Sequence, residues 1–492
     1  MEKKVTKATK ETADNKECKD CSSKLTVCES TQQLHDLACK EGINTIFERA
    51  ADMKACPIGA DGSCCKNCAM GPCRVPPSKK EGEPAKVGLC GASAETIAAR
   101  NFCRMVAAGS AAHSDHGRGV AEVFILAAKG EIPGYGIKDV QKLLQLGLDF
   151  GLDVESMSTQ ELAVKVGELC LAEFGRQEGE LTLTKRAPLK RQELWRKNNM
   201  MPRGIDREVV ECLHRTHMGV DQNYKNLVTQ AARAALSDGW GGAMIASELQ
   251  DIMFGTPVPI TGNIDLGVLK EEDVNIIVHG HEPLLSEMVV VACQAPEMID
   301  YAKSKGAKGI TLAGMCCTAN EILVRHGIPI AGNFLQQEFA IMTGALDAMV
   351  VDVQCIMQAV TATAKNFHTI VITTSPKAMM EDATHIQFEE HDAVNTAKQI
   401  VRAAIDNYTK RDKKKVHIPK GNTNSMVVGF SHETINYLLG GNFRASYKPL
   451  NDNIINGRIR GIAGVVGCNN ARSTQDFCNL TLVKELIKND VI

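Results

Sequence analysis

The chain has 492 residues, 56 Lys and Arg against 58 Asp and Glu, and a hydrophobic fraction of 44%. This length predicts about three domains at roughly 150 residues each, and the net charge of −2 argues against a disordered polyelectrolyte or a nucleic-acid-binding protein. No apolar run approaches the roughly 18 residues of a membrane span, and the charged first residues lack the apolar core of a secretory signal. The composition therefore favours a large cytoplasmic protein with no transmembrane segment and no nucleic-acid partner.

Cysteines gather near the N-terminus: 11 of the 19 fall within the first 103 residues. In a large cytoplasmic chain such density indicates metal or redox centres rather than disulfides. Residues 1–55 begin polar and charged and then carry widely spaced cysteines, which predicts a loosely built N-terminal extension. The pair Cys18-x2-Cys21 within it is a weak signal, for which free thiols remain the simpler interpretation.

The strongest local pattern is Cys65-x2-Cys68-x4-Cys73-x16-Cys90, in a stretch rich in Gly and Pro with little apolar periodicity. Four closely spaced thiolates suit a [4Fe–4S] cluster, which would order this stretch in place of a hydrophobic core. Zinc accepts the same residue types, although structural zinc sites usually show two CxxC pairs, and free thiols are a third possibility.

Cys56 and Cys64 remain beside this pattern, and they supply only two thiols where a cubane cluster needs four. Either they bind nothing, or two chains each donate a pair across a two-fold axis. The sequence of one chain leaves both alternatives open.

Residues 56–250 are predicted to be a helical iron–sulfur cluster domain, with helical patterns from about Ala94 to Trp240. Ser158 and Glu161 have the spacing of a capping box. The glycine-rich residues 239–242 are predicted to form a turn.

Residues 251–412 read as a Rossmann-like α/β domain with a mainly parallel sheet, because short apolar strands alternate with helical stretches. A charged linker at 410–415 separates it from a second such domain over 413–492. The fold class is thus multidomain α and α/β, with the last domain incomplete. The expected strands are 274–278, 309–313, 348–353, 369–373, 425–430 and 461–466.

Four of these strands are followed by a soft metal ligand. His279 and His281 follow the first, Cys316 and Cys317 the second, and the remaining two precede one cysteine each, namely Cys355 and Cys468. Open α/β sheets collect their ligands at the carboxyl ends of strands, and Cys with His suits iron, nickel or zinc. A single cysteine after a strand is usually just buried, but four such placements together predict a metal site.

His113 and His116 are three residues apart in a predicted helix, so they share one helix face or end. They are expected either to move protons beside a redox site or to form hydrogen bonds in a packed helix.

Together these motifs resemble the nickel–iron carbon monoxide dehydrogenases, a family related to the hybrid-cluster proteins. The resemblance runs from about Cys56 to the last residue. Its carriers are Cys56-x7-Cys64-Cys65-x2-Cys68-x4-Cys73, Cys90-Gly91-Ala92, the segment 111–118 with its two histidines, the segment 278–283, Cys316-Cys317-Thr318, the segment 350–355 and the segment 465–470.

The resemblance implies a homodimer whose bridging cluster is held by Cys56 and Cys64 of each chain, and a [4Fe–4S] cluster within each chain. It also implies a Ni–Fe–S cluster at which His281 and Cys317 hold the outer iron, with His279 as second choice. Cys316 would lie beside this site, and His113 would stand next to the cluster with a proton role. The resemblance assigns the remaining cluster ligands as Cys65, Cys68, Cys73 and Cys90 for the [4Fe–4S] cluster and Cys355 and Cys468 for the cubane irons.

The implied reaction oxidises carbon monoxide with water to carbon dioxide, two protons and two electrons, and a ferredoxin-like carrier would accept the electrons. The rival interpretations are a hybrid-cluster protein of the hydroxylamine reductase kind, disfavoured by Cys56-x7-Cys64-Cys65, and a truncated, non-catalytic electron-transfer protein.

Three features depart from the family. A helix over 480–488 and the first residues of a strand precede Ile492, whereas the family continues with further cluster cysteines and a lysine, so a fragment of a complete carbon monoxide dehydrogenase subunit is expected. Gly119 and Glu122 stand where relatives often continue the histidine series. The cysteines without an assigned role are Cys18, Cys21, Cys28 and Cys39, together with the mostly structural Cys103, Cys170, Cys212, Cys293 and Cys478.

Overall fold

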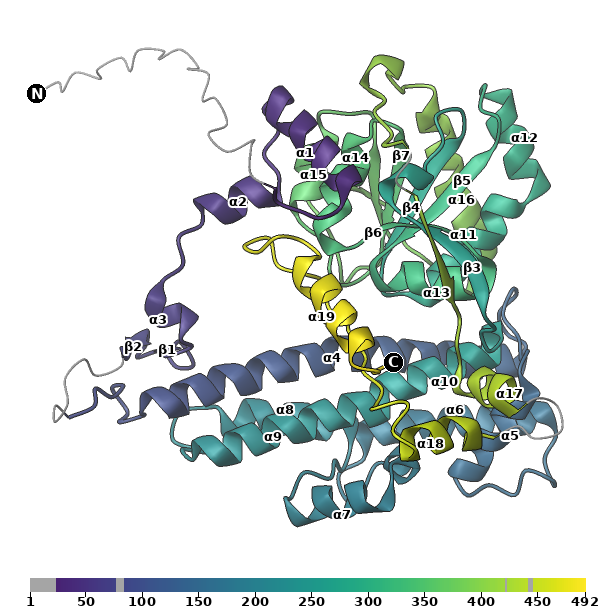
Figure 1. Cartoon of the computed structure of the whole chain (residues 1–492). Helices are drawn as coiled ribbons and strands as arrows, with labels where there is room; N and C mark the ends of the chain where they lie inside the picture. Colours follow the sequence, from purple (N-terminus) through teal and green to yellow (C-terminus); the bar gives the residue numbers. More distant parts are fainter. Residues whose placement is uncertain (1–23, 77–83, 421–422, 441–445) are drawn as a thin grey trace, which may run out of the picture.

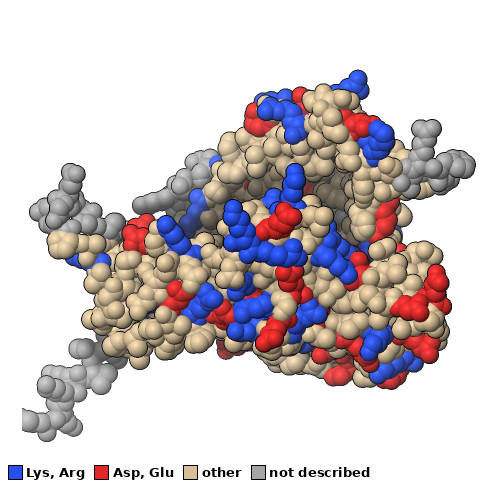
Figure 2. All heavy atoms as spheres, turned by 90° about the horizontal axis from the view of Figure 1, so that it is seen from below, with Lys and Arg blue, Asp and Glu red and all other residues tan. Residues whose placement is uncertain are grey.

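A computed structural model describes residues 24–76, 84–420, 423–440 and 446–492. It contains a layer of helices and, above it, a sheet covered by helices on both faces (Figure 1). No helix in the described ranges is long and apolar enough to cross a membrane. On the face of the helical layer turned away from the sheet, acidic and basic side chains are intermixed (Figure 2).

The helical layer is organised around α4 (Ala94–Lys129), which contacts most of the other helices. Ser93 caps its first turn by accepting a hydrogen bond from the Thr96 backbone N–H at 3.3 Å, and Gly130 ends it in the left-handed region. The Ser158–Glu161 capping box is confirmed at the start of α6. The other helices of the layer are α5 (Val140–Asp149), α6 (Thr159–Gly175), α7 (Leu189–Lys197), α8 (Ile205–Arg215), α9 (Tyr224–Ser237) and α10 (Ala243–Phe254).

The turn predicted for 239–242 is wrong. The chain continues from α9 to α10 through a π-helical segment, Asp238–Gly242. Glycines there allow a close approach to α4, because a Cβ on Gly242 would lie 2.5 Å from the Ser114 hydroxyl. Glycine-rich composition thus marks a tight helix contact here and not a chain reversal.

The large sheet has the strand order β10-β3-β6-β5-β4-β7-β8-β9, and all neighbours are parallel except β10, which is antiparallel to β3. Five of the six expected strands correspond to β4, β5, β7, β8 and β10. The strands are β3 (Ile260–Ile264), β4 (Val274–Gly280), β5 (Ile310–Met315), β6 (Ile330–Gly332), β7 (Leu346–Val351), β8 (Ile370–Thr373), β9 (Thr384–His385) and β10 (Asn424–Val428).

Alternation along β4 divides the core into two halves. Ile276 and Val278 belong to a cluster with α11 (Pro283–Gln294) and α16 (Ala393–Tyr408), whereas Ile277 belongs to a second cluster on the opposite face. β4 is buried along its whole length, as expected for a central parallel strand. The other helices of this part are α12 (Pro296–Ser304), α13 (Cys316–His326), α14 (Gln337–Met342) and α15 (Ala359–Ala364).

The N-terminal extension is not loosely built where it is described. Helices α1 (Glu29–Glu41) and α2 (Ile46–Asp52) pack Leu34, Ala38 and Phe47 into the second core cluster, against the sheet. Cys18 and Cys21 lie outside the described residues.

The strand expected over 461–466 does not form. Residues 460–463 hydrogen-bond to residues 490–492, with one isolated bridge between Gly461 and Val491, but the side chains of Ile462 and Val466 are 63% and 90% exposed. The helix expected over 480–488 is present within α19 (Phe477–Lys488).

The class of a helical part followed by a parallel α/β part is confirmed. The described residues after 412 add β10 to the large sheet, then α17 (His432–Gly440), α18 (Lys448–Ile455) and α19. The domain boundaries at 56, 251 and 413 stay a prediction.

Candidate metal centres

The structure brings the four cysteines of the local pattern to one small pocket, lined by Cys65, Cys68, Cys73 and Cys90. Two short strands, β1 (Cys64–Cys65) and β2 (Cys73–Arg74), pair Cys65 with Cys73. The backbone turns tightly between them, since a Cβ on Gly71 would lie 2.9 Å from the Cys65 carbonyl oxygen. Glycine is therefore required where the loop folds over the thiols.

Arg100 of α4 supplies a buried positive charge to this pocket. Its side chain is 1% exposed, it lines the pocket, and its Nε and Nη2 atoms have no hydrogen-bond partner within the described residues. The pKa of the Cys90 thiol is lowered by the Ala92 backbone and by Arg100. A buried cation with free donors facing four thiols fits a negatively charged iron–sulfur cluster.

Cys56 and Cys64 do not line this pocket. Cys56 is exposed at the start of α3 (Pro57–Ala60), where the Gly59 backbone and Arg74, whose Nη2 donates to its Sγ at 3.5 Å, lower its pKa. A thiol with a lowered pKa at the surface is suited to a ligand shared with another chain.

The second site forms where β4, β5 and β7 end. Gly280 has φ +140, and a Cβ there would overlap the carboxylate of Asp352, which follows β7. Asp352 accepts hydrogen bonds from the backbone N–H of His281 at 2.7 Å and from that of Val353. This carboxylate thus joins the end of β4 to the end of β7, and its burial raises its pKa to about 8.

The loop that carries Cys355 is held in place by the side chain of Gln337, which is fully buried. The Gln337 side chain donates to the Cys355 carbonyl at 2.8 Å and accepts from the Met357 backbone N–H at 2.9 Å. Gln354 and Cys355 both have left-handed backbones, with φ of 66 and 58. Two consecutive strained residues held by a buried amide are typical of a functional loop.

His281, Cys317, Cys355 and Cys468 come together in the structure. The Cys355 Sγ lies 3.9 Å from the His281 Nε2. Burial, and after it the neighbouring thiols of Cys355 and Cys468, raise the pKa of Cys317 to about 11. Imidazole and thiols converging on one point form a donor set for iron or nickel. Because 461–466 is not a strand, Cys468 arrives on a loop, contrary to expectation.

The two alternative histidines differ in position. His279 is fully buried within β4, and burial lowers its pKa to about 4. His281, beyond the strand end, approaches Cys355, and its pKa is lowered to about 4 by burial and by the charges of His113 and His116. The geometry favours His281 as the residue facing the thiols, and Cys316 lies beside them as a half-buried residue with φ 61.

His113 and His116 both reach this region from α4. The His113 ring centroid is 6.2 Å from that of His281, and its Nδ1 lies 3.2 Å from the Asp238 carboxylate, which raises the His113 pKa. The His116 Nδ1 lies 3.8 Å from Glu282.

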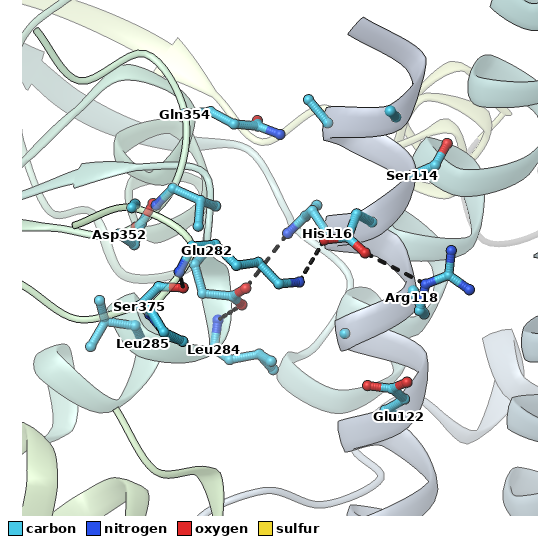
Figure 3. A pocket seen from close by; sticks show the side chains of 18 of the residues that line it. Ser114, His116, Arg118, Glu122, Glu282, Leu284, Leu285, Asp352, Gln354 and Ser375 are labelled. Atoms are coloured by element: carbon cyan, nitrogen blue, oxygen red, sulfur yellow. Dashed lines mark hydrogen bonds and ion pairs between the residues drawn. The ribbon is translucent and has the colours of Figure 1, made fainter. Parts of the chain in front are cut away.

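A cavity of about 920 Å³ opens between α4 and the strand ends. Figure 3 shows His116 and Glu282 pointing toward one another across it, with Glu122 farther along α4. Gly119 also lines this cavity. Gly119 and Glu122, the two positions that depart from the histidine series, therefore line an open cavity that also contains the Glu282 carboxylate.

Sequence reasoning missed Asp238, Glu282, Asp352 and Gln337. Asp352 follows a predicted strand and was within reach of the same strand-end argument. Gln337 and Asp238 carry no local signal, because their roles depend on contacts to distant segments. Of the cysteines without a role, Cys103, Cys170, Cys212 and Cys293 are buried, and Cys478 is exposed.

A parallel sheet with imidazole and thiol ligands at its strand ends, beside a four-cysteine pocket, defines a redox metalloprotein. The chain belongs to the Prismane/CO dehydrogenase family, whose model matches residues 63–492. Carbon monoxide dehydrogenase 1 of Methanosarcina mazei is 48% identical over 478 residues, covering 96% of this chain and 75% of that protein. Carbon monoxide dehydrogenase 1 of Carboxydothermus hydrogenoformans is 44% identical, covering 95% of this chain and 74% of that protein.

Solved structures agree. A Ni-free carbon monoxide dehydrogenase from Thermococcus sp. AM4 is 46% identical and superposes with a TM-score of 0.92, covering 95% of this chain and 73% of that one. An acetyl-CoA synthase/carbon monoxide dehydrogenase, described with NiZn[Fe4S4] and NiNi[Fe4S4] clusters in its alpha subunits, is 41% identical with a TM-score of 0.91, covering 96% and 71%. The expected family is confirmed.

Proposed function

We propose that the complete protein to which this chain belongs oxidises carbon monoxide with water to carbon dioxide, releasing two protons and two electrons. The observation that carries the proposal is the convergence of His281, Cys317, Cys355 and Cys468, with the His113 ring close to that of His281. The relatives, which are named carbon monoxide dehydrogenases, favour this reaction over the hybrid-cluster alternative.

In this proposal Cys65, Cys68, Cys73 and Cys90 hold a [4Fe–4S] cluster, and the strand-end ligands hold a Ni–Fe–S cluster. Cys56 and Cys64 of two chains hold a second cubane in a homodimer. Electrons pass through these clusters to a ferredoxin-like carrier, and the protein works in the cytoplasm. The exposure of Cys56 and the buried Arg100 at the four-cysteine pocket support these assignments.

The bound metals would supply a soft centre for the carbon of carbon monoxide and would lower the pKa of water toward neutrality. The chain's own groups fix geometry and handle protons. Asp352 and Gly280 lock His281 at the strand end, and Gln337 fixes the Cys355 loop. A rigid ligand shell of this kind keeps the site's geometry through each turnover.

His113 is suited to hold a proton beside the site. Asp238 engages its Nδ1 and raises its pKa, which leaves Nε2 to exchange a proton. From there His116 and Glu282, which face one another across the cavity, offer the next acceptors toward solvent.

The test is to purify the complete protein without oxygen, measure nickel and iron, and follow reduction of a viologen by carbon monoxide. We expect nickel and carbon-monoxide-dependent reduction together. Iron without nickel and without this activity would favour the electron-transfer alternative, whereas hydroxylamine reduction without nickel would favour the hybrid-cluster alternative.

A further inference from the structure

A cavity of about 400 Å³ opens in the helical layer, and it shares no lining residue with the four-cysteine pocket or the large cavity beside α4. Its walls come from the loop after α6, from α7 and the loop that follows, and from α8 and α9. In Figure 1, α7 lies on the side of α8 and α9 that is turned away from the sheet. The charged residues that line this cavity are Arg196, Arg203, Arg215 and Arg233, with Glu180 and Glu211. We call it the arginine pocket, and positive charge exceeds negative charge on its wall.

Most of the arginines around the pocket have a carboxylate partner. Arg203 donates two hydrogen bonds of 2.9 Å to Glu208, which is fully buried behind the wall. Glu211 is shared, because its oxygens lie 2.5 Å from Arg203 and from Arg215, and 3.0 Å from Arg207, which does not line the pocket. One carboxylate cannot neutralise several guanidinium groups, so the acidic side chains of this network are fully used by these three arginines.

Arg233 of α9 is the cation that this network leaves without a direct counter-charge. It is 5% exposed, and the nearest carboxylate oxygens among the described residues, on Glu208 and Glu211, lie 3.8 and 3.9 Å away. Its hydrogen bonds go to neutral groups: the Asn199 carbonyl accepts from Nε at 3.1 Å and from Nη2, and the Gln230 side chain accepts from Nη1 at 3.3 Å. Burial lowers the pKa of Arg233. Because an unpaired buried charge is costly, the pocket favours an added anion.

The donors on the wall suit an anion with several oxygens. Arg203 lines the pocket, and its Nη1 donates to no group within the described residues, so it remains for a ligand. Planar guanidinium groups present pairs of N–H donors that match the oxygens of a phosphate. The volume of the pocket lies in the range of small-molecule sites, so a phosphate can enter with an organic group attached.

The rim of the pocket carries one exposed ion pair. Arg196 of α7 donates two hydrogen bonds of 2.7 Å to Glu180, and the two side chains are 47% and 40% exposed. Such exposed pairs contribute little to stability, so Arg196 can exchange the Glu180 carboxylate for an oxygen of an entering anion.

We propose that the arginine pocket binds a phosphate dianion, either free or as the terminal group of a small phosphomonoester. Arg233 and Arg203 are its main donors, and Arg196 closes on it from the rim. This inference is independent of the proposed reaction, because the pocket shares no residue with the metal centres.

The experiment titrates the complete protein, purified without oxygen in a chloride buffer of fixed ionic strength, with inorganic phosphate, adenosine 5′-monophosphate and adenosine by calorimetry. We expect each phosphate-bearing probe to saturate one site per chain and adenosine to give no binding. Tighter binding of adenosine monophosphate would assign the pocket to phosphomonoesters, and tighter binding of inorganic phosphate to the free anion. Absence of saturable binding of both up to about 10 mM would overturn the proposal, as would adenosine binding as tightly as its monophosphate.

Arg233→Gln is expected to weaken the binding of both phosphate-bearing probes at least about tenfold, since it removes a charge-assisted donor. The matched control is Arg207→Gln, which removes the same charge from the same network but lies outside the pocket, and it should change the affinity less than about twofold. Equal weakening in the two variants would show that only the net charge matters and would overturn the assignment to the pocket.

Glu180→Gln keeps the proposal testable even if Arg233→Gln fails to fold, because Glu180 is an exposed residue. The substitution frees Arg196 and removes a negative charge from the rim, so phosphate should bind about two- to fivefold more tightly. An affinity that stays the same or falls in this variant would contradict a phosphate at the arginine pocket. Iron content and urea unfolding, compared with the wild-type protein, establish that each variant is folded.

Discussion

The two candidate cluster sites are built in opposite ways. The four-cysteine pocket is made from one short stretch, residues 65–90, with two-residue strands and tight glycine turns, and it borrows only Arg100 and a few neighbours from elsewhere. The strand-end site collects four ligands from across almost 190 residues, from His281 to Cys468, and depends on the order of strands in the sheet. The first site is assembled from one local stretch of sequence, whereas the second is assembled by the fold of the sheet.

This difference predicts that a substitution at one site leaves the metal content of the other site unchanged. The largest effect is expected for Cys355→Ala, which removes a ligand that the fold places beside His281. Carbon monoxide oxidation should fall by more than about 100-fold, the upper range for losses in the supporting shell of a metal. The [4Fe–4S] signal from the Cys65 pocket should remain, as measured by electron paramagnetic resonance and viologen reduction.

Cys478→Ala is the matched control, because Cys478 is exposed on α19 and has no assigned role. It should retain activity. If Cys355→Ala still turned over carbon monoxide, the strand ends would not be the active site.

A second variant tests whether the fold preforms the strand-end site. Gly280→Ala places a Cβ against the Asp352 carboxylate at φ +140, so His281 must shift. We expect stability to fall by about 1–3 kcal/mol from the strained backbone and activity to fall about 10–100-fold. Urea unfolding and viologen assays measure the two effects.

Gly306→Ala separates strain from overlap. Gly306 also has a positive φ, +93, but has nothing within 4 Å of its added Cβ. It should lose stability yet keep its activity. Equal losses of activity in both variants would contradict the role given to the Gly280–Asp352 contact.

A further variant concerns Cys56, which is exposed beside the four-cysteine pocket. Cys56→Ala should weaken the dimer or its bridging cluster and leave the Cys65 cluster in place, because Cys56 lies outside that pocket. Iron per dimer should fall by up to one cubane, with sedimentation velocity reporting the dimer. An iron count equal to that of the wild-type protein would count against the bridging assignment.

The smallest effect concerns the joint between the two parts. Lys377 reaches from the sheet part to Asp115 on α4 at 2.5 Å, and both side chains are about half exposed. Asp115→Asn should cost at most about 1 kcal/mol, and less at high salt. Burial opposes the charge, but Lys377 and Arg118 lower the pKa of Asp115, so the contribution is present at neutral pH and disappears as pH falls through that lowered pKa.

Urea unfolding of wild type and variant at pH 7 and pH 3 measures this loss. Asp382→Asn, which breaks a comparably exposed pair with Lys365, serves as the control. A pH-independent difference between wild type and Asp115→Asn would show that charge is not the cause.

The features that local sequence patterns encode could be predicted from the sequence. Cysteine spacing located the pocket of Cys65, and apolar runs located β4, β5 and β7 with their ligands. Prediction failed at 461–466, where, within the described residues, residues 460–463 hydrogen-bond only to the short segment 490–492 and the apolar side chains of Ile462 and Val466 stay exposed instead of entering a sheet. The supporting residues Asp238 and Gln337 escaped for the same reason: their partners are fixed by tertiary structure.

The π-helical segment changes the phase of one long helix. Before it, Ala231 and Ala234 share a cluster with Cys103 and Cys212 of the helical layer, and after it Ile245 and Leu249 join the core that extends into the sheet. Each residue of a helix turns it by about 100°. Removing a single residue from Asp238–Gly242 would restore an ordinary helix and rotate all of α10 away from its partners. The one extra residue of the π-helical turn therefore sets how α10 is rotated relative to α9, so that each helix faces its own core. The same turn brings Asp238 to His113.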